Sequence, residues 1–183
     1  MPLNGIVTIV SETQGIGMSD PLLHSELVNA SKRYTSMLTP GHVAVEPRRQ
    51  LAIVSCMDSR IDLFGLLGLE IGDAHVIRNA GGVVTDDVIR SLSISQRLLN
   101  TEAILLIHHT DCGLQKVTDD SFKDLLEEAS GVRPPWSVEA FRDPFSDVRQ
   151  SMGRIKNSPF IAMKDAVWGY VYDVDTHQLV PVI

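Results

Sequence analysis

Two short, unbroken apolar runs, at residues 51–54 and 103–107, constrain the fold of this chain more than any other feature. Runs without alternating polar residues are typical of strands in a parallel sheet that helices cover on both faces. Together with three further stretches, they predict strands at 51–56, 74–79, 103–109 and 168–174, and a short one at 178–183. These strands alternate with helical patterns, which predicts an α/β domain with a central, mostly parallel β-sheet flanked by helices.

Helical patterns occupy the segments between the strands. Thr85 is an N-cap followed by two acidic residues, which predicts that a helix starts there. Pro144 opens another helix, and apolar residues at spacings of three and four mark its inner side. The segment 118–130 is highly charged, so we expect it to lie on the surface.

The N-terminal part of the chain differs from the rest. Residues 1–19 contain scattered Gly, Ser and Thr and are predicted to form an arm. Asp20 and Pro21 then combine an N-cap with proline at the first helical position, and the apolar spacing that follows predicts a helix over 20–38. A chain of 183 residues without an internal repeat fits a single domain spanning 1–183.

Polar residues stand where three of the predicted strands end: Cys56, Asn79 and His109. Sites in open parallel sheets form beyond the carboxyl ends of the strands. Cys112 follows His109 by three residues, and two thiolates with one imidazole supply three tetrahedral zinc ligands. A fourth position left open distinguishes catalytic zinc from structural zinc. The pattern therefore predicts an enzyme that activates water.

Two alternatives remain open at this site. Both cysteines are compatible with buried apolar thiols that bind no metal. His108 competes with His109 for the ligand role, because adjacent residues of a strand point to opposite faces and spacing does not decide between them. His108 is equally compatible with a core histidine, a group that orients a ligand, or a proton carrier.

Asp58 and Arg60 lie two and four residues after Cys56. Asp58 is close enough to fill the fourth metal position or to accept a hydrogen bond from water there, and Arg60 is placed to clamp its carboxylate bidentately. The plain alternative is a solvent-exposed ion pair at a helix start. The loop 78–82 contains two glycines that allow close backbone approach, although a tight strand-to-helix turn explains them equally well.

The charge balance argues against several classes of function. Sixteen basic against 23 acidic residues give a net charge of −7, which disfavours a nucleic-acid or anionic-membrane surface. No apolar stretch approaches the roughly 18 to 20 residues of a membrane span, and the N-terminus lacks the pattern of a secretory signal. We therefore expect a cytoplasmic protein that acts on a small-molecule substrate, with no nucleic-acid or membrane partner.

The order of these motifs resembles the β-class carbonic anhydrases. Cys-x-Asp-x-Arg, an Arg-Asn-Ala-Gly loop and His-x-x-Cys-Gly occur between residues 51 and 113 in the order and spacing of that family. The resemblance implies the β-carbonic-anhydrase fold with Zn2+ as cofactor, and it favours His109 over His108. The implied metal ligands are Cys56, His109 and Cys112, and the implied catalytic pair is Asp58 and Arg60.

For a member of this family the expected reaction is the reversible hydration of carbon dioxide to bicarbonate, in which hydroxide formed at zinc attacks a small linear electrophile. Segments 108–112 and 81–87 resemble a subgroup that includes carbonyl sulfide hydrolases, so release of hydrogen sulfide and carbon dioxide from carbonyl sulfide is the alternative. A non-catalytic domain, in which Asp58 closes a structural zinc site, is a third interpretation. The family also implies a homodimer or homotetramer, with the helix over 20–38 packing on the partner subunit.

Overall fold

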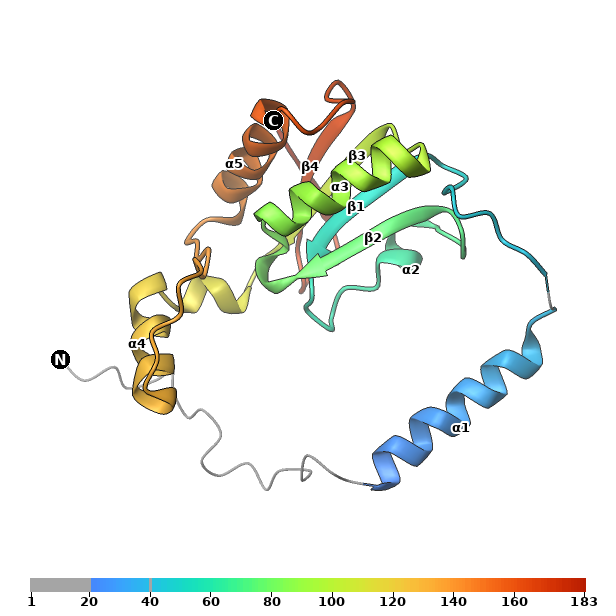
Figure 1. Ribbon diagram of the computed structural model, residues 1–183, viewed down its shortest axis with the longest axis horizontal. Coiled ribbons are helices and arrows are strands. Elements are labelled where there is room, and N and C mark those ends of the chain that lie inside the picture. The colour runs from blue at the N-terminus through green and yellow to red at the C-terminus, as the bar shows by residue number, and fades with distance from the viewer. Residues whose placement is uncertain (1–20, 40) are drawn as a thin grey trace. The chain divides into compact units, whose positions relative to one another are not determined.

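The computed structural model of the protein describes residues 21–39 and 41–183 (Figure 1). The chain divides into two units at the boundary between Val43 and Ala44, and each is described by itself. Within the described ranges, none of the helices combines the length and the apolar character needed to cross a membrane.

Helix α1 (Pro21–Met37) belongs to the first unit and corresponds to the helix expected over 20–38. The predicted cap at Asp20 and the arm at 1–19 lie outside the described residues. On the apolar side of α1, the Leu27 side chain is 62% exposed and Tyr34 is also exposed. The helix therefore presents an apolar stripe that is open to solvent.

A five-stranded sheet in the order β2-β1-β3-β4-β5 forms the centre of the second unit. Four strands pair in parallel and β5 runs antiparallel at one edge. The strands are β1 (Leu51–Cys56), β2 (Ala74–Asn79), β3 (Ala103–His109), β4 (Val167–Tyr172) and β5 (Leu179–Val182). The α/β class and the mostly parallel sheet are confirmed, with every predicted strand boundary within two residues of the observed one.

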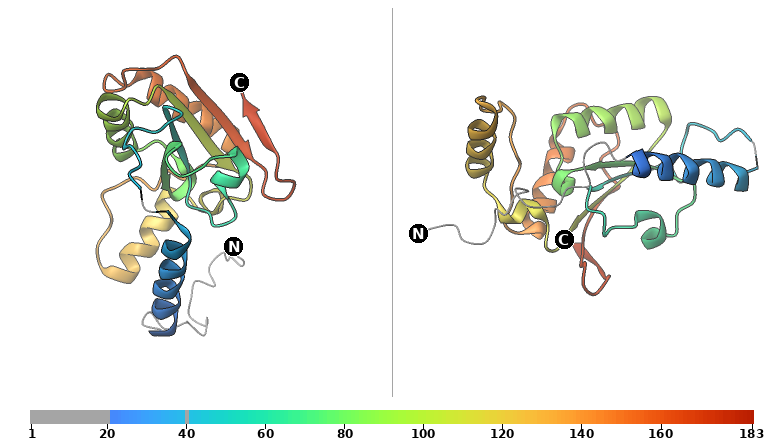
Figure 2. Two further views of the ribbon diagram at one scale, coloured as in Figure 1. Left: turned by 90° about the vertical axis from the view of Figure 1, so that its right-hand side faces the viewer. Right: turned by 90° about the horizontal axis from the view of Figure 1, so that it is seen from below.

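Helices cover both faces of this sheet (Figure 2). On one face lie α3 (Asp86–Leu99) and α5 (Pro144–Asn157), where Leu92 and Ile155 are completely buried in the core between helices and sheet. The short α2 (Leu63–Leu67) packs with a second apolar cluster on the opposite face. Burial on both faces explains why β1 and β3 are apolar without alternation.

The starts of the two long helices follow from local chemistry. Thr85 Oγ1 accepts a hydrogen bond from the N–H of Val88 and caps α3, as its sequence position predicts. Asp143 caps α5 in the same way, with Pro144 at the first helical position. Both caps satisfy backbone donors that have no partner inside the helix.

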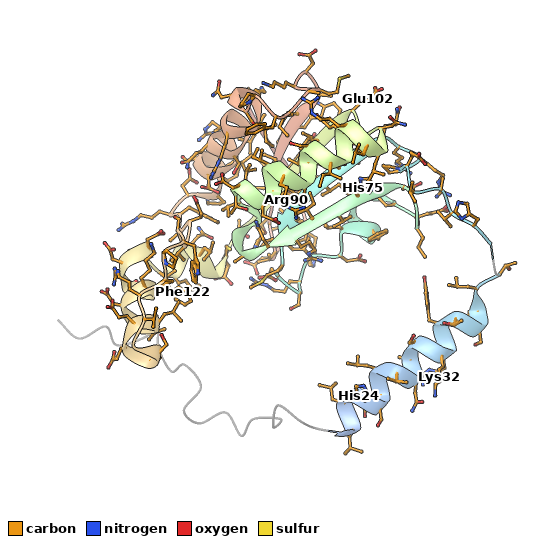
Figure 3. All side chains as sticks on the ribbon, viewed as in Figure 1. His24, Lys32, His75, Arg90, Glu102 and Phe122 are labelled. Atoms are coloured by element: carbon orange, nitrogen blue, oxygen red, sulfur yellow. The ribbon has the colours of Figure 1, made fainter. Side chains whose placement is uncertain are left out.

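Helix α4 (Asp119–Ser130) is the surface helix expected from the charged segment 118–130. None of its residues is buried, and Phe122, labelled in Figure 3, is only partly covered. Arg133, which follows the helix, pairs with three of its acidic residues: Asp120, Asp124 and Glu127. Exposed ion pairs of this kind contribute little stability singly. No residue of α4 belongs to the apolar core clusters of the described chain.

Candidate metal centre

Three side chains that can bind a metal meet at the carboxyl edge of the sheet. Cys56 ends β1 and His109 ends β3, and because these strands are parallel neighbours their ends lie side by side. Cys112 follows β3 by one short turn. The Sγ atoms of Cys56 and Cys112 are 4.0 Å apart, and the three ligand atoms lie within 4.8 Å of one another. The structure brings together the three residues that were expected as ligands.

His109 is oriented to bind through Nε2. Its Nδ1 lies 2.8 Å from the carbonyl oxygen of Thr110, which can only accept, so Nδ1 carries the proton. Nε2 is buried and has no hydrogen-bond partner in the described part of the chain. A buried lone pair without a donor is costly unless something binds it. Two sulfurs and one imidazole nitrogen suit a zinc ion, so these residues fit that metal.

The two cysteine thiols interact directly. A hydrogen bond from the Cys112 thiol is the main cause that lowers the pKa of Cys56 below that of a free thiol. The same contact, together with burial, raises the pKa of Cys112. The pair therefore releases one proton readily and holds the second. A cation between the sulfurs favours release of both, since thiolates are the form that binds metal.

Asp58 lies beside this cluster, and its carboxylate accepts hydrogen bonds from the Arg60 guanidinium. Nε of Arg60 donates to Oδ1 at 2.9 Å and Nη2 donates to Oδ2 at 2.8 Å, the bidentate clamp that the spacing predicts. These bonds hold the pKa of Asp58 well below the usual carboxyl range. Oδ2 is also 3.8 Å from Nε2 of His109, and the Asp58 side chain is only 18% exposed. An ionised carboxylate thus stands at the margin of the ligand cluster rather than in open solvent.

The loop after β2 supports the strand end that carries Cys56. Gly82 has a φ of +73°, and a Cβ there would lie 2.7 Å from the backbone nitrogen of Cys56. The Arg78 guanidinium donates to the carbonyl oxygens of Cys56 at 2.9 Å and Asp58 at 2.6 Å. Both interpretations of the glycines are correct, because η1 (Ala80–Gly82) forms a tight turn and approaches the backbone closely.

Asp111 is a site residue that the sequence reasoning missed, although it lies inside the His-x-x-Cys motif. Its carboxylate accepts hydrogen bonds from Arg60 at 2.9 Å and pairs with Lys116 at 2.8 Å. Lys116 and then Arg60 lower the pKa of Asp111. The sequence offers only a general indication of a role for Asp111. Asp tolerates the left-handed backbone conformation that this tight turn requires.

His108 is not part of the cluster. It is completely buried, its Nε2 lies 2.7 Å from Oδ2 of Asp147 on α5, and its ring contacts Phe141. Because α5 covers the opposite face of the sheet, the two adjacent histidines point to opposite faces, as expected for a strand. In the ranges that the structure describes, Cys56, His109 and Cys112 are the only group of three or more such side chains close enough to hold a metal.

Comparison with known proteins identifies the family. The family model for carbonic anhydrase matches residues 51–179. "Beta-carbonic anhydrase 1" of Mycobacterium tuberculosis is 52% identical over 139 residues, which is 76% of this chain and 85% of that protein. A carbon disulfide hydrolase of Saccharolobus solfataricus is 35% identical over 155 residues, covering 72% of this chain and 76% of that protein.

A solved structure agrees with these matches. The crystal structure of a carbonic anhydrase from Streptococcus mutans superposes with a TM-score of 0.83 and 40% identity, covering 87% of this chain and 97% of that one. The family match includes the ends of β1 and β3 and the turn that carries Cys112. This chain therefore belongs to the β-carbonic anhydrase family of enzymes.

Proposed function

We propose that this protein is a zinc enzyme that reversibly hydrates carbon dioxide to bicarbonate, with Cys56, His109 and Cys112 as its metal ligands. The observation that carries the proposal is the Nε2 of His109, which has no hydrogen-bond partner among the described residues and lies beside two sulfurs 4.0 Å apart. Zinc bound there supplies Lewis acidity that makes hydroxide available from water near neutral pH. The 52% identity to a β-carbonic anhydrase supports the same reaction.

Asp58 is proposed as the acceptor that orients the attacking water. Because Arg60 keeps its pKa low, the Asp58 carboxylate is ionised at neutral pH and accepts hydrogen bonds without donating any. Its Oδ2, 3.8 Å from Nε2 of His109, is close enough to the ligand cluster to accept a hydrogen bond from water there. That bond directs a lone pair of the water oxygen toward the carbon of the substrate. Arg60 acts through Asp58 by fixing the carboxylate plane.

Substitution Asp58→Asn tests this role. The amide is nearly isosteric but is a poorer acceptor and breaks the bidentate clamp of Arg60. We expect the variant to retain one zinc per chain and to lose about 10²- to 10⁴-fold in kcat for carbon dioxide hydration. Asp87→Asn is the matched control, since it removes an exposed carboxylate in the first turn of α3 that pairs with Arg90 and makes no contact with Asp58 or Arg60. Full activity of zinc-loaded Asp58→Asn would remove Asp58 from the mechanism.

A second candidate function is hydrolysis of a sulfur analogue of carbon dioxide. The carbon disulfide hydrolase of Saccharolobus solfataricus, at 35% identity, is the specific observation that favours it. Carbon disulfide and carbonyl sulfide are linear and electrophilic at carbon, so the same site could act on either and release hydrogen sulfide. Discrimination would come from the walls of the pocket rather than from the metal ligands.

Turnover of carbon dioxide, carbonyl sulfide and carbon disulfide on one zinc-verified preparation separates these functions. We expect carbon dioxide to dominate by kcat/KM. Dominant hydrogen sulfide release would instead support the sulfur substrates. Bound zinc without turnover of any of the three would leave only the structural zinc domain, in which Asp58 completes a closed site.

We also propose that the active form is a homodimer or a homotetramer in which α1 packs on a partner subunit. The apolar stripe of α1, including Leu27 and Tyr34, is exposed, and an isolated helix of 17 residues is marginally stable without such packing. Leu27→Glu should shift the mass measured by light scattering toward the monomer. Asn29→Glu, on the other side of the helix, should not. Equal masses for the two variants would contradict this role of α1.

A cytoplasmic location belongs to the same proposal. Cys56 and Cys112 are both free, and metal binding requires them as thiolates. Reducing compartments preserve free thiols, whereas oxidising compartments favour disulfides. Fractionation of cells that express the protein tests the location, and recovery outside the cytoplasm would contradict it.

A further inference from the structure

Arg60 is held from two sides, and only one of them is the Asp58 clamp. On the other side Nη1 donates to Oδ2 of Asp111 at 2.9 Å, and Nη2 donates to the backbone carbonyl oxygen of Asp111 at 3.1 Å. The guanidinium therefore makes hydrogen bonds through all three of its nitrogens. Arg60 itself is 43% exposed, so these bonds rather than packing determine where it lies.

Two partners compete for the Asp58 carboxylate. One is Arg60, which the carboxylate contacts in this structure, and the other is the ligand cluster, where His109 Nε2 lies 3.8 Å from Oδ2. A carboxylate is itself a competent zinc ligand. Whatever secures Arg60 therefore also biases Asp58 toward the position that leaves the fourth metal position free for water.

Asp111 is built into the turn that positions the metal ligands. Its φ is +54°, a left-handed conformation that Asp and Asn tolerate better than other side chains. The carbonyl oxygen of the residue before it, Thr110, accepts a hydrogen bond from Nδ1 of His109, and the residue after it is Cys112. Lys116 pairs with Oδ1 of Asp111 at 2.8 Å, leaving Oδ2 for Arg60. One short turn thus orients two metal ligands and anchors Arg60.

We propose that Asp111 is a positioning residue that, through Arg60, holds the Asp58 carboxylate off the metal and so keeps the fourth position open. This inference rests on the proposed zinc function of the site. Lys116, Asp111, Arg60 and Asp58 form a chain of alternating charges that ends at the ligand cluster. Loss of the Asp111 charge loosens Arg60, and the population in which Asp58 occupies the metal rises.

Asp111→Asn is the informative variant, because Asn keeps the left-handed turn and the backbone carbonyl contact to Arg60 but removes the charge. The probe is azide, titrated into the cobalt-substituted protein and followed by its visible spectrum. Only the open population binds azide or turns over. The apparent Kd for azide should therefore rise, and kcat/KM should fall, by the same factor of about 10. Metal content should stay at one per chain. Asp87→Asn is the control and should change neither quantity.

The same substitution in the Asp58→Asn background completes the test. Without the Asp58 carboxylate nothing competes with azide for the metal, so Asp111→Asn should change the azide Kd there by less than about twofold. The inference is overturned if azide affinity is unchanged in the single Asp111→Asn variant, or if the loss persists in the Asp58→Asn background. Failure of the wild-type protein to bind the metal or to hydrate carbon dioxide would instead refute the proposed function. The wild-type protein is therefore measured first.

Discussion

Gly82→Ala introduces one methyl group at the most crowded backbone approach near the metal centre. The new Cβ would lie 2.7 Å from the backbone nitrogen of Cys56, 2.9 Å from the carbonyl carbon of Ser55 and 3.3 Å from the carbonyl oxygen of Ile107. All three are backbone atoms of β1 and β3, so no flexible side chain can move aside. Relief of the contact requires the turn or the strand end that carries Cys56 to shift.

Two separate costs add in this variant. The φ of +73° at Gly82 places alanine in the left-handed region, at about 1–2 kcal/mol. Overpacking against fixed atoms adds about 1–3 kcal/mol, so the free energy of unfolding should fall by about 2–5 kcal/mol. Gly131→Ala isolates the first cost, because Gly131 has a φ of +77° and a Cβ added there would meet no atom of the described residues within 4 Å.

Urea unfolding of the zinc-loaded proteins, at one protein concentration and one zinc concentration, measures both variants. Gly82→Ala should be less stable than Gly131→Ala by about 1–3 kcal/mol, the overpacking cost alone. It should also bind zinc more weakly, because the shift acts on the strand end beside Cys56. Equal stability and equal zinc affinity of the two variants would refute the close packing of the turn against that strand end.

Three further predictions concern the groups around the site. His109→Ala should weaken zinc binding by at least about 100-fold in a chelator competition assay, and unchanged affinity would exclude His109 as a ligand. Arg78→Met should lower the free energy of unfolding by about 2–4 kcal/mol in urea titration, because backbone carbonyls, including that of Cys56, lose their charged donor. A change within error would show that water replaces the guanidinium. Hydrogen bonds from the Glu70 N–H and from Arg48 lower the pKa of Asp73 in the folded protein. The Asp73 carboxylate therefore stabilises the fold fully at pH values above the ordinary carboxyl pKa of about 3.9. This contribution is lost as the pH falls through the lower pKa of the folded state. Asp73→Asn should therefore destabilise the protein at pH 7 in thermal unfolding, with the difference from wild type shrinking in acid; a difference independent of pH would contradict the ion pair.

The sheet and the ligand cluster could be predicted from the sequence because both depend on local pattern. Continuous apolar runs identify strands buried on both faces, and the parallel arrangement places their carboxyl ends at one edge. From that alone Cys56, Cys112 and one of the two adjacent histidines are expected to lie together, and the bidentate contact of Arg60 with Asp58 follows from a spacing of two.

The anchoring of Arg60 could not be predicted in this way. Asp111 lies 51 residues from Arg60, and a single ion pair across two strands leaves no periodic signal in the sequence. The choice between His108 and His109 has a similar cause. Alternation shows that they face opposite sides of the strand and the family resemblance favours His109, but only the placement of α5, with Asp147 against His108, shows which side each ring occupies.

The central claim is that one zinc ion, held by Cys56, His109 and Cys112, makes this chain a carbon dioxide hydratase. Stopped-flow hydration measured while zinc is titrated into the metal-free protein tests it most directly. The account predicts that activity rises linearly with added zinc and stops rising at one zinc per chain. Zinc that binds at one per chain without bringing activity, or full activity before any zinc is added, would contradict it.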